Sequence, residues 1–332
     1  MNRAFPAGVL LMLVAIGLVA CGRSSPDRSP TAEAPATTTI ATTVAASPNP
    51  SAPAKTATSI THGVSHGTIE FAGIERSYRL FVPSGVEATE PAPLVVALHG
   101  GLGSGDQFAG ASNFETLAES EGFIVVFPDG LDRTWNAGTC CGQSVRKNTD
   151  DVGFLANLID QLEATLPVDP ERVFMTGHSN GAMMAFRFGC ERADMVKAIA
   201  PVAGSIEIPS CQPSRGVSLI AIHGDADQNH PIDGGEGPRS IAGVSYRSMH
   251  DTLDMWTAAM NCESEPDHRT AGALTSTVWV DCRDNTRATY MVIAGADHPW
   301  PGGVAGSPAL SGTPSQALDA TLAVWSFFKT LP

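Results

Sequence analysis

A five-residue turn near the middle of the chain constrains the fold more than any other segment. The turn is Gly177-His178-Ser179-Asn180-Gly181; an apolar run at residues 173–175 precedes it, and small residues that suit a helix start follow it. Glycine on both sides of the serine lets a strand and a helix approach closely, with the serine in a strained backbone conformation. Its hydroxyl would project into a cleft beside free helix N-terminal amides. The segment therefore predicts Ser179 as a nucleophile, and His178 as a packing residue.

The bare pattern Gly-x-Ser-x-Gly is a weak signal in a chain that holds 33 glycines. Its alternative interpretation is an ordinary glycine turn between a strand and a helix. The functional interpretation gains support because the other residues that such a nucleophile needs follow it in the expected chain order.

The N-terminus resembles an export signal. Arg3 supplies a positive start, residues 9–20 form a short apolar run, and Leu18-Val19-Ala20-Cys21-Gly22 resembles a bacterial lipobox. A run of this length is too short to span a bilayer comfortably. We therefore expect residues 1–21 to be a lipoprotein signal peptide, with Cys21 lipidated and holding the protein on the membrane. The alternative is a plain secretory signal peptide that ends near Ala20.

Composition divides the remainder into a tether and a folded domain. Residues 22–60 are rich in Ser, Thr, Pro and Ala and have almost no large apolar side chains, so they predict a disordered tether. Residues 61–332 suit one α/β domain. The formal net charge of −14 argues against a nucleic-acid partner and fits an extracytoplasmic protein with a neutral substrate.

Six cysteines remain when Cys21 is set apart from the seven in the chain. An even number in an exported domain suggests disulfides, and the preferred local pairs are Cys262–Cys282 and Cys190–Cys211. Cys140 and Cys141 would then either bond to each other or stay free. No Cys-x-x-Cys spacing is present, so we expect no metal site.

The apolar pattern of the folded part predicts buried strands that alternate with helices. The expected elements are a hairpin at 68–82 around Gly73, strands at 94–98, 123–127, 173–175, 198–202, 217–222 and 289–293, and helices at 112–121, 152–166 and 318–330. A long polar loop covers residues 129–150, and Asp150-Asp151 can cap the helix that follows. This alternation implies a mostly parallel sheet with helices on both faces.

A serine nucleophile needs a base, and the base needs an acid that orients it. The strand at 217–222 leads into His223-Gly-Asp-Ala-Asp227, so Asp225 and Asp227 are both candidates for the acid. The last strand leads into Asp297-His298, and His298 is the expected base.

Two backbone amides should form an oxyanion hole. Asn180 follows the nucleophile and supplies one amide. The glycine-rich turn His99-Gly-Gly-Leu-Gly-Ser104 should supply the other, from Gly101 first and Leu102 second. A merely flexible turn is the alternative. Trp135 and Trp300 are candidates for binding an aromatic or sugar group at the cleft, with ordinary packing as the alternative.

These motifs together resemble the secreted polyhydroxybutyrate depolymerase and feruloyl esterase family, related to carbohydrate esterase family 1, and its actinobacterial lipoproteins. The resemblance covers about residues 94–303 and rests on Leu98-His-Gly-Gly, Trp135-Asn-Ala-Gly, Cys140-Cys141-Gly142, Asp150-Asp-Val-Gly-Phe154, Val168-Asp-Pro-Glu-Arg-Val, the turn around Ser179, His223-Gly-Asp-Ala-Asp227 and His298-Pro-Trp-Pro-Gly302.

The resemblance implies an α/β-hydrolase fold and ester hydrolysis without a cofactor. It favours Asp227 over Asp225, because the family pattern is His-Gly-x-x-Asp, and it supports Ser179 and His298. His230 departs from the pattern, since relatives often have a small apolar residue there. The family acts on hydroxyalkanoates, feruloylated sugars and acetylated xylan, so it implies an acyl-enzyme esterase of extracytoplasmic esters without fixing the substrate. The alternatives are a catalytically silent surface lipoprotein that binds glycans or host molecules, and a serine peptidase.

Overall fold

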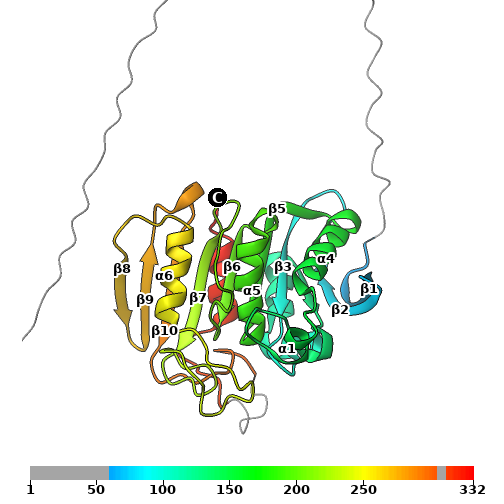
Figure 1. The fold of residues 1–332 in the computed structure, drawn as a ribbon. Coiled ribbons are helices and arrows are strands. Elements are labelled where there is room, and N and C mark those ends of the chain that lie inside the picture. The colour runs from blue at the N-terminus through cyan, green and yellow to red at the C-terminus, as the bar shows by residue number, and fades with distance from the viewer. Residues whose placement is uncertain (1–59, 305–311) are drawn as a thin grey trace, which may run out of the picture. The chain divides into compact units, whose positions relative to one another are not determined.

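A ten-stranded sheet forms the centre of the computed structural model, which describes residues 60–304 and 312–332 (Figure 1). The expected signal peptide at 1–21, with Cys21, and all but the last residue of the expected tether at 22–60 lie outside the described residues. Across the sheet, the strands follow the order β1 (Gly63–Phe71), β2 (Ile74–Val82), β4 (Ile124–Pro128), β3 (Ala92–Leu98), β5 (Val168–His178), β6 (Ala198–Val202), β7 (Ser218–Gly224), β10 (Ala288–Ile293), β9 (Leu274–Trp279) and β8 (Asp267–Ala271).

The middle of the sheet is parallel and its two margins are antiparallel. Strands β4, β3, β5, β6, β7 and β10 pair in parallel, whereas the hairpin β1–β2 closes one side and the hairpin β9–β8 closes the other. Because the carboxyl ends of parallel strands meet at one edge, the loops that follow β3, β5, β7 and β10 gather there. This edge is the lower one in Figure 1.

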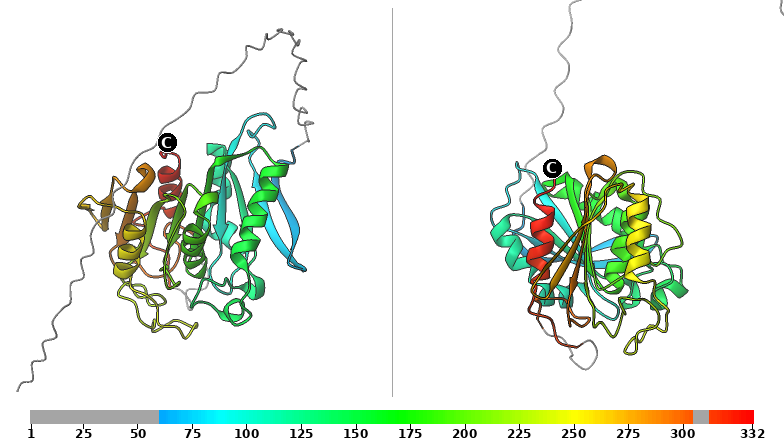
Figure 2. Two further views of the ribbon diagram at one scale, coloured as in Figure 1. Left: turned by 45° about the horizontal axis from the view of Figure 1, so that its top comes forward. Right: turned by 90° about the vertical axis from the view of Figure 1, so that its left-hand side faces the viewer.

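Two hydrophobic cores lie on opposite faces of the sheet. In β3, Leu94, Val96 and Leu98 belong to one core and Val95 and Ala97 to the other, as strand alternation requires. Helices α4 (Asp151–Thr165), α5 (Asn180–Glu191) and α6 (Met249–Ala259) pack on the first core, and α1 (Gly105–Ser112), α2 (Phe114–Glu121) and α8 (Ala320–Phe328) on the second. Figure 2 shows both layers edge-on. The predicted fold class is confirmed.

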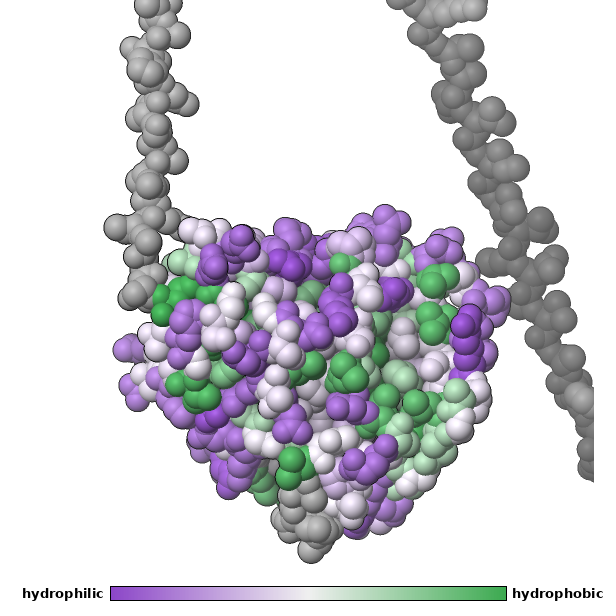
Figure 3. Space-filling model, turned by 180° about the vertical axis from the view of Figure 1, so that it is seen from behind, coloured by the Kyte–Doolittle hydropathy of each residue, from purple (hydrophilic) through white to green (hydrophobic). Residues whose placement is uncertain are grey.

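The surface behind the sheet carries polar and apolar residues interspersed with one another (Figure 3). Leu322 on α8 is 49% exposed, as isolated apolar residues on protein surfaces often are. Within the described ranges, no helix is long and apolar enough to cross a membrane.

Several elements differ from the sequence-based prediction. The helix expected at 112–121 is present as α2, and a further helix, α1, lies directly before it where a glycine-rich turn was expected. Asn113, in a left-handed conformation with φ 59°, separates the two. The expected loop at 129–150 contains a 3₁₀ turn, Leu131–Arg133, and a short helix α3, Gly142–Arg146. Helix α6 and the β8–β9 hairpin were not predicted. The signal for α6 was available, because Met249, Leu253 and Trp256 are apolar at helical spacing and are buried. Strand β8 is exposed throughout and has no apolar pattern.

The described part of the chain contains three disulfides. Cys190–Cys211 and Cys262–Cys282 match the preferred pairs, and Cys140 is bonded to Cys141. Cys190–Cys211 ties the end of α5 to the segment that precedes β7.

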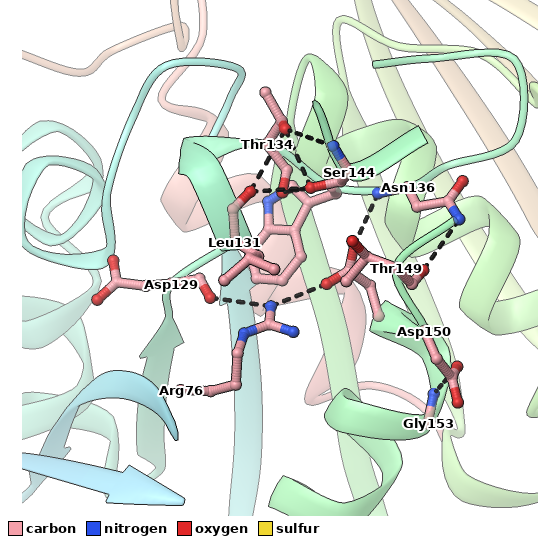
Figure 4. A network of polar contacts seen from close by, with 12 residues as sticks. Arg76, Asp129, Leu131, Thr134, Asn136, Ser144, Thr149, Asp150 and Gly153 are labelled. Carbon is pink, nitrogen blue, oxygen red and sulfur yellow. Dashed lines mark hydrogen bonds and ion pairs between the residues drawn. The ribbon is translucent and has the colours of Figure 1, made fainter. Parts of the chain in front are cut away.

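A buried ion pair organises the long loop before α4 (Figure 4). Arg76 and Asp151 are 4% and 0% exposed, and Nη2 of Arg76 donates to Oδ1 of Asp151 at 2.8 Å and to the carbonyl oxygen of Asp129 at 3.1 Å. The guanidinium also lies 3.8 Å from the ring centre of Phe154.

Asp150, and not Asp151, caps α4 by accepting a hydrogen bond from the amide of Gly153 at 2.8 Å.

Replacing Asp151 by Asn should lower the free energy of unfolding by about 3 kcal/mol, because it leaves the Arg76 guanidinium buried without its counter-charge. Urea denaturation at neutral pH measures the change. The matched control is Arg269→Gln, which breaks an ion pair whose side chains are 80% and 55% exposed and should change stability by less than about 0.5 kcal/mol. Equal effects of the two substitutions would contradict the importance of the buried pair.

Candidate active site

Ser179 lies at the crossing of β5 and α5 in a backbone conformation that is rare for a residue with a side chain, with φ 55° and ψ −119°. A Cβ atom on Gly177 would lie 2.4 Å from the carbonyl oxygen of Gly181. A Cβ atom on Gly181 would lie 2.4 Å from the carbonyl oxygen of Leu98. Because neither contact is tolerable, the turn requires both glycines. The strand, sharp turn and helix are present as the sequence predicts.

The side chain of His298 lies between those of Ser179 and Asp227. His298 Nε2 is 2.9 Å from Ser179 Oγ, and His298 Nδ1 is 2.7 Å from Asp227 Oδ2. The three residues follow β5, β7 and β10 at the carboxyl edge of the sheet. The structure therefore brings together three side chains that are up to 119 residues apart in sequence.

Asp227 is 3% exposed and fully hydrogen-bonded. Its Oδ1 accepts hydrogen bonds from the amides of Asn229 and His230, both at 2.8 Å. Burial alone would raise the pKa of Asp227, but the charge and hydrogen bond of His298, together with His223 nearby, lower it overall. The ionised carboxylate accepts from Nδ1–H of His298, which leaves Nε2 free to accept the proton of Ser179.

The competing carboxylate, Asp225, does not reach the histidine. It is exposed, and its Oδ1 accepts a hydrogen bond from the amide of Gly295 at 2.6 Å. This hydrogen bond joins the loop after β7 to the loop after β10. The geometry therefore favours Asp227 as the partner of His298.

The turn after β3 lies beside Ser179 and Asn180. A Cβ atom on Gly100 would lie 3.4 Å from Cβ of Ser179, and one on Gly101 would lie 3.9 Å from Cβ of Asn180. The amide of Leu102 already donates to the carbonyl oxygen of Arg133 at 2.8 Å. Within residues 60–304 and 312–332, no hydrogen bond of the Gly101 amide is recorded. Gly101, rather than Leu102, is thus the better candidate for the second oxyanion donor.

Buried His99 fixes the start of this turn. Its Nδ1–H donates to the carbonyl oxygen of Gly100 at 2.7 Å, and its Nε2 accepts from the amide of Gly130 at 2.9 Å. Burial lowers the pKa of His99, which keeps the imidazole neutral and therefore able to accept at Nε2.

The two tryptophans predicted to contact substrate are buried. Trp135 is 0% exposed, and its indole nitrogen donates to the carbonyl oxygen of His99 at 2.9 Å. Trp300 is 4% exposed, donates to Thr321 Oγ1 at 3.0 Å, and has its ring 5.1 Å from that of Phe108. The predicted substrate contact does not fit this burial. The alternative interpretation, ordinary packing, describes both residues better, because their ring surfaces are already covered by the core.

Residues that the sequence analysis missed hold the loops of Asp227 and His298 together. Asp297 Oδ1 accepts from the amides of His298 at 2.9 Å and Gln228 at 3.3 Å, and its Oδ2 pairs with Arg239. His230, the departure from the family pattern, is buried and bonds Ser205 Oγ through Nε2 at 2.7 Å. An aspartate directly before the expected base was the available signal for Asp297.

Two surface hollows lie away from Ser179. One, of about 240 Å³, is near Pro91 and Lys329, and the other, of about 530 Å³, is near Gly138 and Arg187. In the two described ranges, no group of three or more His, Cys, Asp or Glu side chains could hold a metal ion.

His178 supports His298 from the backbone side. Its Nε2–H donates to the carbonyl oxygen of His298 at 2.8 Å. Burial, followed by the charge of His298, lowers the pKa of His178 from 6.5 to about 4. His178 is therefore neutral over the range in which the unfolded chain would protonate it.

Stability should consequently fall as the pH drops below the unfolded pKa of about 6.5, since the unfolded state then binds a proton that the folded state resists until about pH 4. His178→Gln keeps a donor but does not titrate. Between pH 7.5 and pH 5, its stability should therefore gain about 1–2 kcal/mol relative to the wild type, measured by urea denaturation. The exposed His250→Gln serves as the control. If the difference in free energy of unfolding between His178→Gln and the wild type did not change with pH, the lowered pKa of His178 would be contradicted.

Comparison with known proteins identifies the family and agrees with the fold. The family model described as esterase PHB depolymerase matches residues 76–290. Feruloyl esterase B of Piromyces equi is 28% identical over 65% of this chain and 41% of its own length. The Nocardia uniformis subsp. tsuyamanensis protein named "Putative esterase NocK" is 29% identical over 70% of this chain and 72% of its own.

Among solved structures, the acetyl xylan esterase from Aspergillus awamori is similar in fold, with a TM-score of 0.53, 18% identity, and coverage of 71% of this chain and 94% of that one. The chain thus spans less than half of one curated relative and nearly three quarters of another. The matched family model covers more than half of the chain and includes Ser179 and Asp227. The chain belongs to the esterase PHB depolymerase family.

Proposed function

We propose that the protein is a serine carboxylic-ester hydrolase that acts through an acyl-enzyme. The observation that carries the proposal is the position of His298, which is within hydrogen-bond distance of both Ser179 Oγ and Asp227 Oδ2. A serine hydroxyl is a weak nucleophile until a base removes its proton, and this arrangement supplies the base and its orienting acid.

In the proposed reaction, His298 Nε2 takes the proton of Ser179 as Oγ attacks the ester carbonyl carbon. The carbonyl oxygen becomes an oxyanion, which accepts hydrogen bonds from the amides of Asn180 and Gly101. Each such donor contributes about 3 kcal/mol in comparable enzymes. The ester bond breaks, the alcohol leaves with the proton from His298, and a water molecule activated by the same histidine then releases the acid. Asp227 stays ionised and stabilises the histidine cation throughout.

The substrate proposed is a neutral carboxylic ester of the feruloyl, acetyl or hydroxyalkanoate type. The names of related proteins support this range, since they include a feruloyl esterase and an acetyl xylan esterase. The net charge of −14 disfavours polyanionic substrates. Methyl ferulate, acetylated xylan, hydroxybutyrate oligomers and acyl chains of graded length, assayed side by side, would separate the classes. A matched amide, compared with its ester, would test the peptidase alternative.

The proposed location is outside the cytoplasm, on a lipid anchor at Cys21. The lipobox-like segment supports the anchor, and the Ser/Thr/Pro/Ala-rich residues 22–60 would serve as a tether for a catalytic domain at 61–332. The disulfides Cys190–Cys211 and Cys262–Cys282 support an oxidising compartment.

Ser179→Ala should abolish hydrolysis of p-nitrophenyl acetate while leaving the thermal unfolding midpoint within a few degrees of the wild type, because the substitution removes only the nucleophilic oxygen. A fluorophosphonate probe should label the wild type and not the variant. Retained turnover in Ser179→Ala would overturn the assignment. A wild type that neither reacts with the probe nor hydrolyses esters would favour the silent binding protein.

The role of Asp227 as the acid can be tested against Asp225, a second aspartate in the same loop. Asp227→Asn should lower kcat by roughly 10⁴-fold, because the amide no longer selects the histidine tautomer that can accept at Nε2. Asp225→Asn should leave kcat within a factor of about three, since Asp225 is exposed and the side-chain oxygen of asparagine can still accept the hydrogen bond from the amide of Gly295.

Cys21→Ser should move the protein from the membrane fraction to the soluble fraction of the producing cells, because serine cannot carry the thioether-linked lipid. Fractionation and detergent-phase partitioning measure the change. Unchanged membrane association and unchanged gel mobility of the variant would count against the anchor.

A further inference from the structure

We propose that Trp135 and the side chain of Asn180 form a bracket that sets the spacing of the two oxyanion donors. The inference rests on the proposed esterase function. Asn180 and Gly101 belong to different loops, one after β5 and the other after β3, so a separate element must hold their amides at a fixed separation. Trp135 bonds to both loops, and it makes no contact with the reacting atoms.

The first half of the bracket joins Trp135 to the nucleophile turn. The side chain of Asn180 accepts a hydrogen bond from the amide of Trp135 at 2.7 Å and donates one to the carbonyl oxygen of Trp135 at 3.0 Å. A side-chain amide thus pairs with the backbone of one residue in both directions, as two backbone segments would. Asn180 is 2% exposed, so water does not compete with these bonds.

The second half joins Trp135 to the turn after β3. Its indole N–H donates to the carbonyl oxygen of His99 at 2.9 Å, and its ring centre lies 5.0 Å from that of His99. Gly100 and Gly101 follow directly. The same carbonyl oxygen would lie 2.6 Å from a Cβ atom on Gly181, so it is packed tightly against the start of α5. A shift of His99 would therefore displace the Gly101 amide relative to that of Asn180.

Trp135 is itself held from the far side of the loop. The amide of Cys141 donates to its carbonyl oxygen at 3.1 Å, and the amide of the next residue, Asn136, donates to Asp151 Oδ2 at 2.7 Å. Asp151 carries the buried ion pair with Arg76 (Figure 4). Arg187 Nη1 donates to the carbonyl oxygen of Asn136 at 2.7 Å. These bonds fix the backbone of the bracket to β2, α4 and α5.

The geometry assigns Trp135 a positioning role, because stabilisation of an oxyanion depends on donors that are already aligned when the charge develops. Loss of the hydrogen bond from the Trp135 indole to His99 would let the Gly101 amide move relative to the Asn180 amide. The effect should fall on the transition state and leave the binding of the ground-state ester nearly unchanged.

Trp135→Phe tests this role, since it keeps an aromatic ring and removes the indole N–H. We expect kcat for p-nitrophenyl acetate to fall about tenfold or more, with KM within a factor of two. The affinity for a phenylboronic acid, which forms a tetrahedral adduct on the serine, should fall in parallel. Trp256→Phe is the matched control: Trp256 is also 0% exposed, and among the described residues its indole nitrogen has no hydrogen-bond partner. It should leave both quantities within twofold.

Asn180→Ala tests the other half independently, because it keeps the backbone donor and removes the bracket. It should also lower kcat and boronate affinity together. The double variant Trp135→Phe/Asn180→Ala should lose less kcat than the product of the two single fold-losses, because both substitutions disrupt the same bracket. Folding is checked by the thermal midpoint of each variant.

The proposal is overturned if Trp135→Phe and Asn180→Ala, while folded, keep wild-type kcat and boronate affinity, or if Trp256→Phe loses as much as Trp135→Phe. A failure of the esterase function itself looks different, because the wild type would then show neither turnover nor boronate binding.

Discussion

The close crossing of β5 over the start of α5 is the constraint on which the rest of the site depends. The crossing leaves no room for a side chain at Gly177 or Gly181 and holds Ser179 at a positive φ. Such a conformation costs on the order of 1–3 kcal/mol and persists only where the surrounding structure enforces it. Here the enforcement comes from β3, β6 and residues 173–177 of β5, which are buried on both faces, and from α5, whose first turn rests against the end of β3.

The parallel sheet turns this local constraint into a site. Because β5, β7 and β10 run in the same direction, the loops that carry Ser179, Asp227 and His298 leave the sheet at one edge. The sheet sets only the approximate positions of these side chains. The final spacing is set by hydrogen bonds within and between loops. Amides of its own loop hold Asp227, whereas the pairing of Asp297 with Arg239 and the bond from His178 to the carbonyl oxygen of His298 join different segments.

The sequence was sufficient for the fold class, the family and most central strands, because buried parallel strands read as continuous apolar runs. It also identified the residues that the structure gathers around His298, since the chain order of the motifs matches the order of the strands. The β8–β9 hairpin was missed because β8 is exposed throughout and lacks an apolar pattern. For the two tryptophans the sequence left substrate contact and ordinary packing both open, because sequence position places a residue near a loop but does not say whether its ring points into the core. Trp135 and Trp300 both point inward.

The antiparallel margins of the sheet have a consequence for how the protein behaves at high concentration. A parallel sheet that ended at β4 or β10 would offer an apolar strand with unpaired backbone groups to any neighbouring molecule. In this chain the last strand on one side is β8, five residues long, which carries Asp267, His268 and Arg269 and is exposed along its whole length. A short, charged border strand of this kind discourages pairing between the sheets of two molecules. On this side of the sheet, β8 and β9 therefore keep the apolar parallel strands from pairing with another molecule.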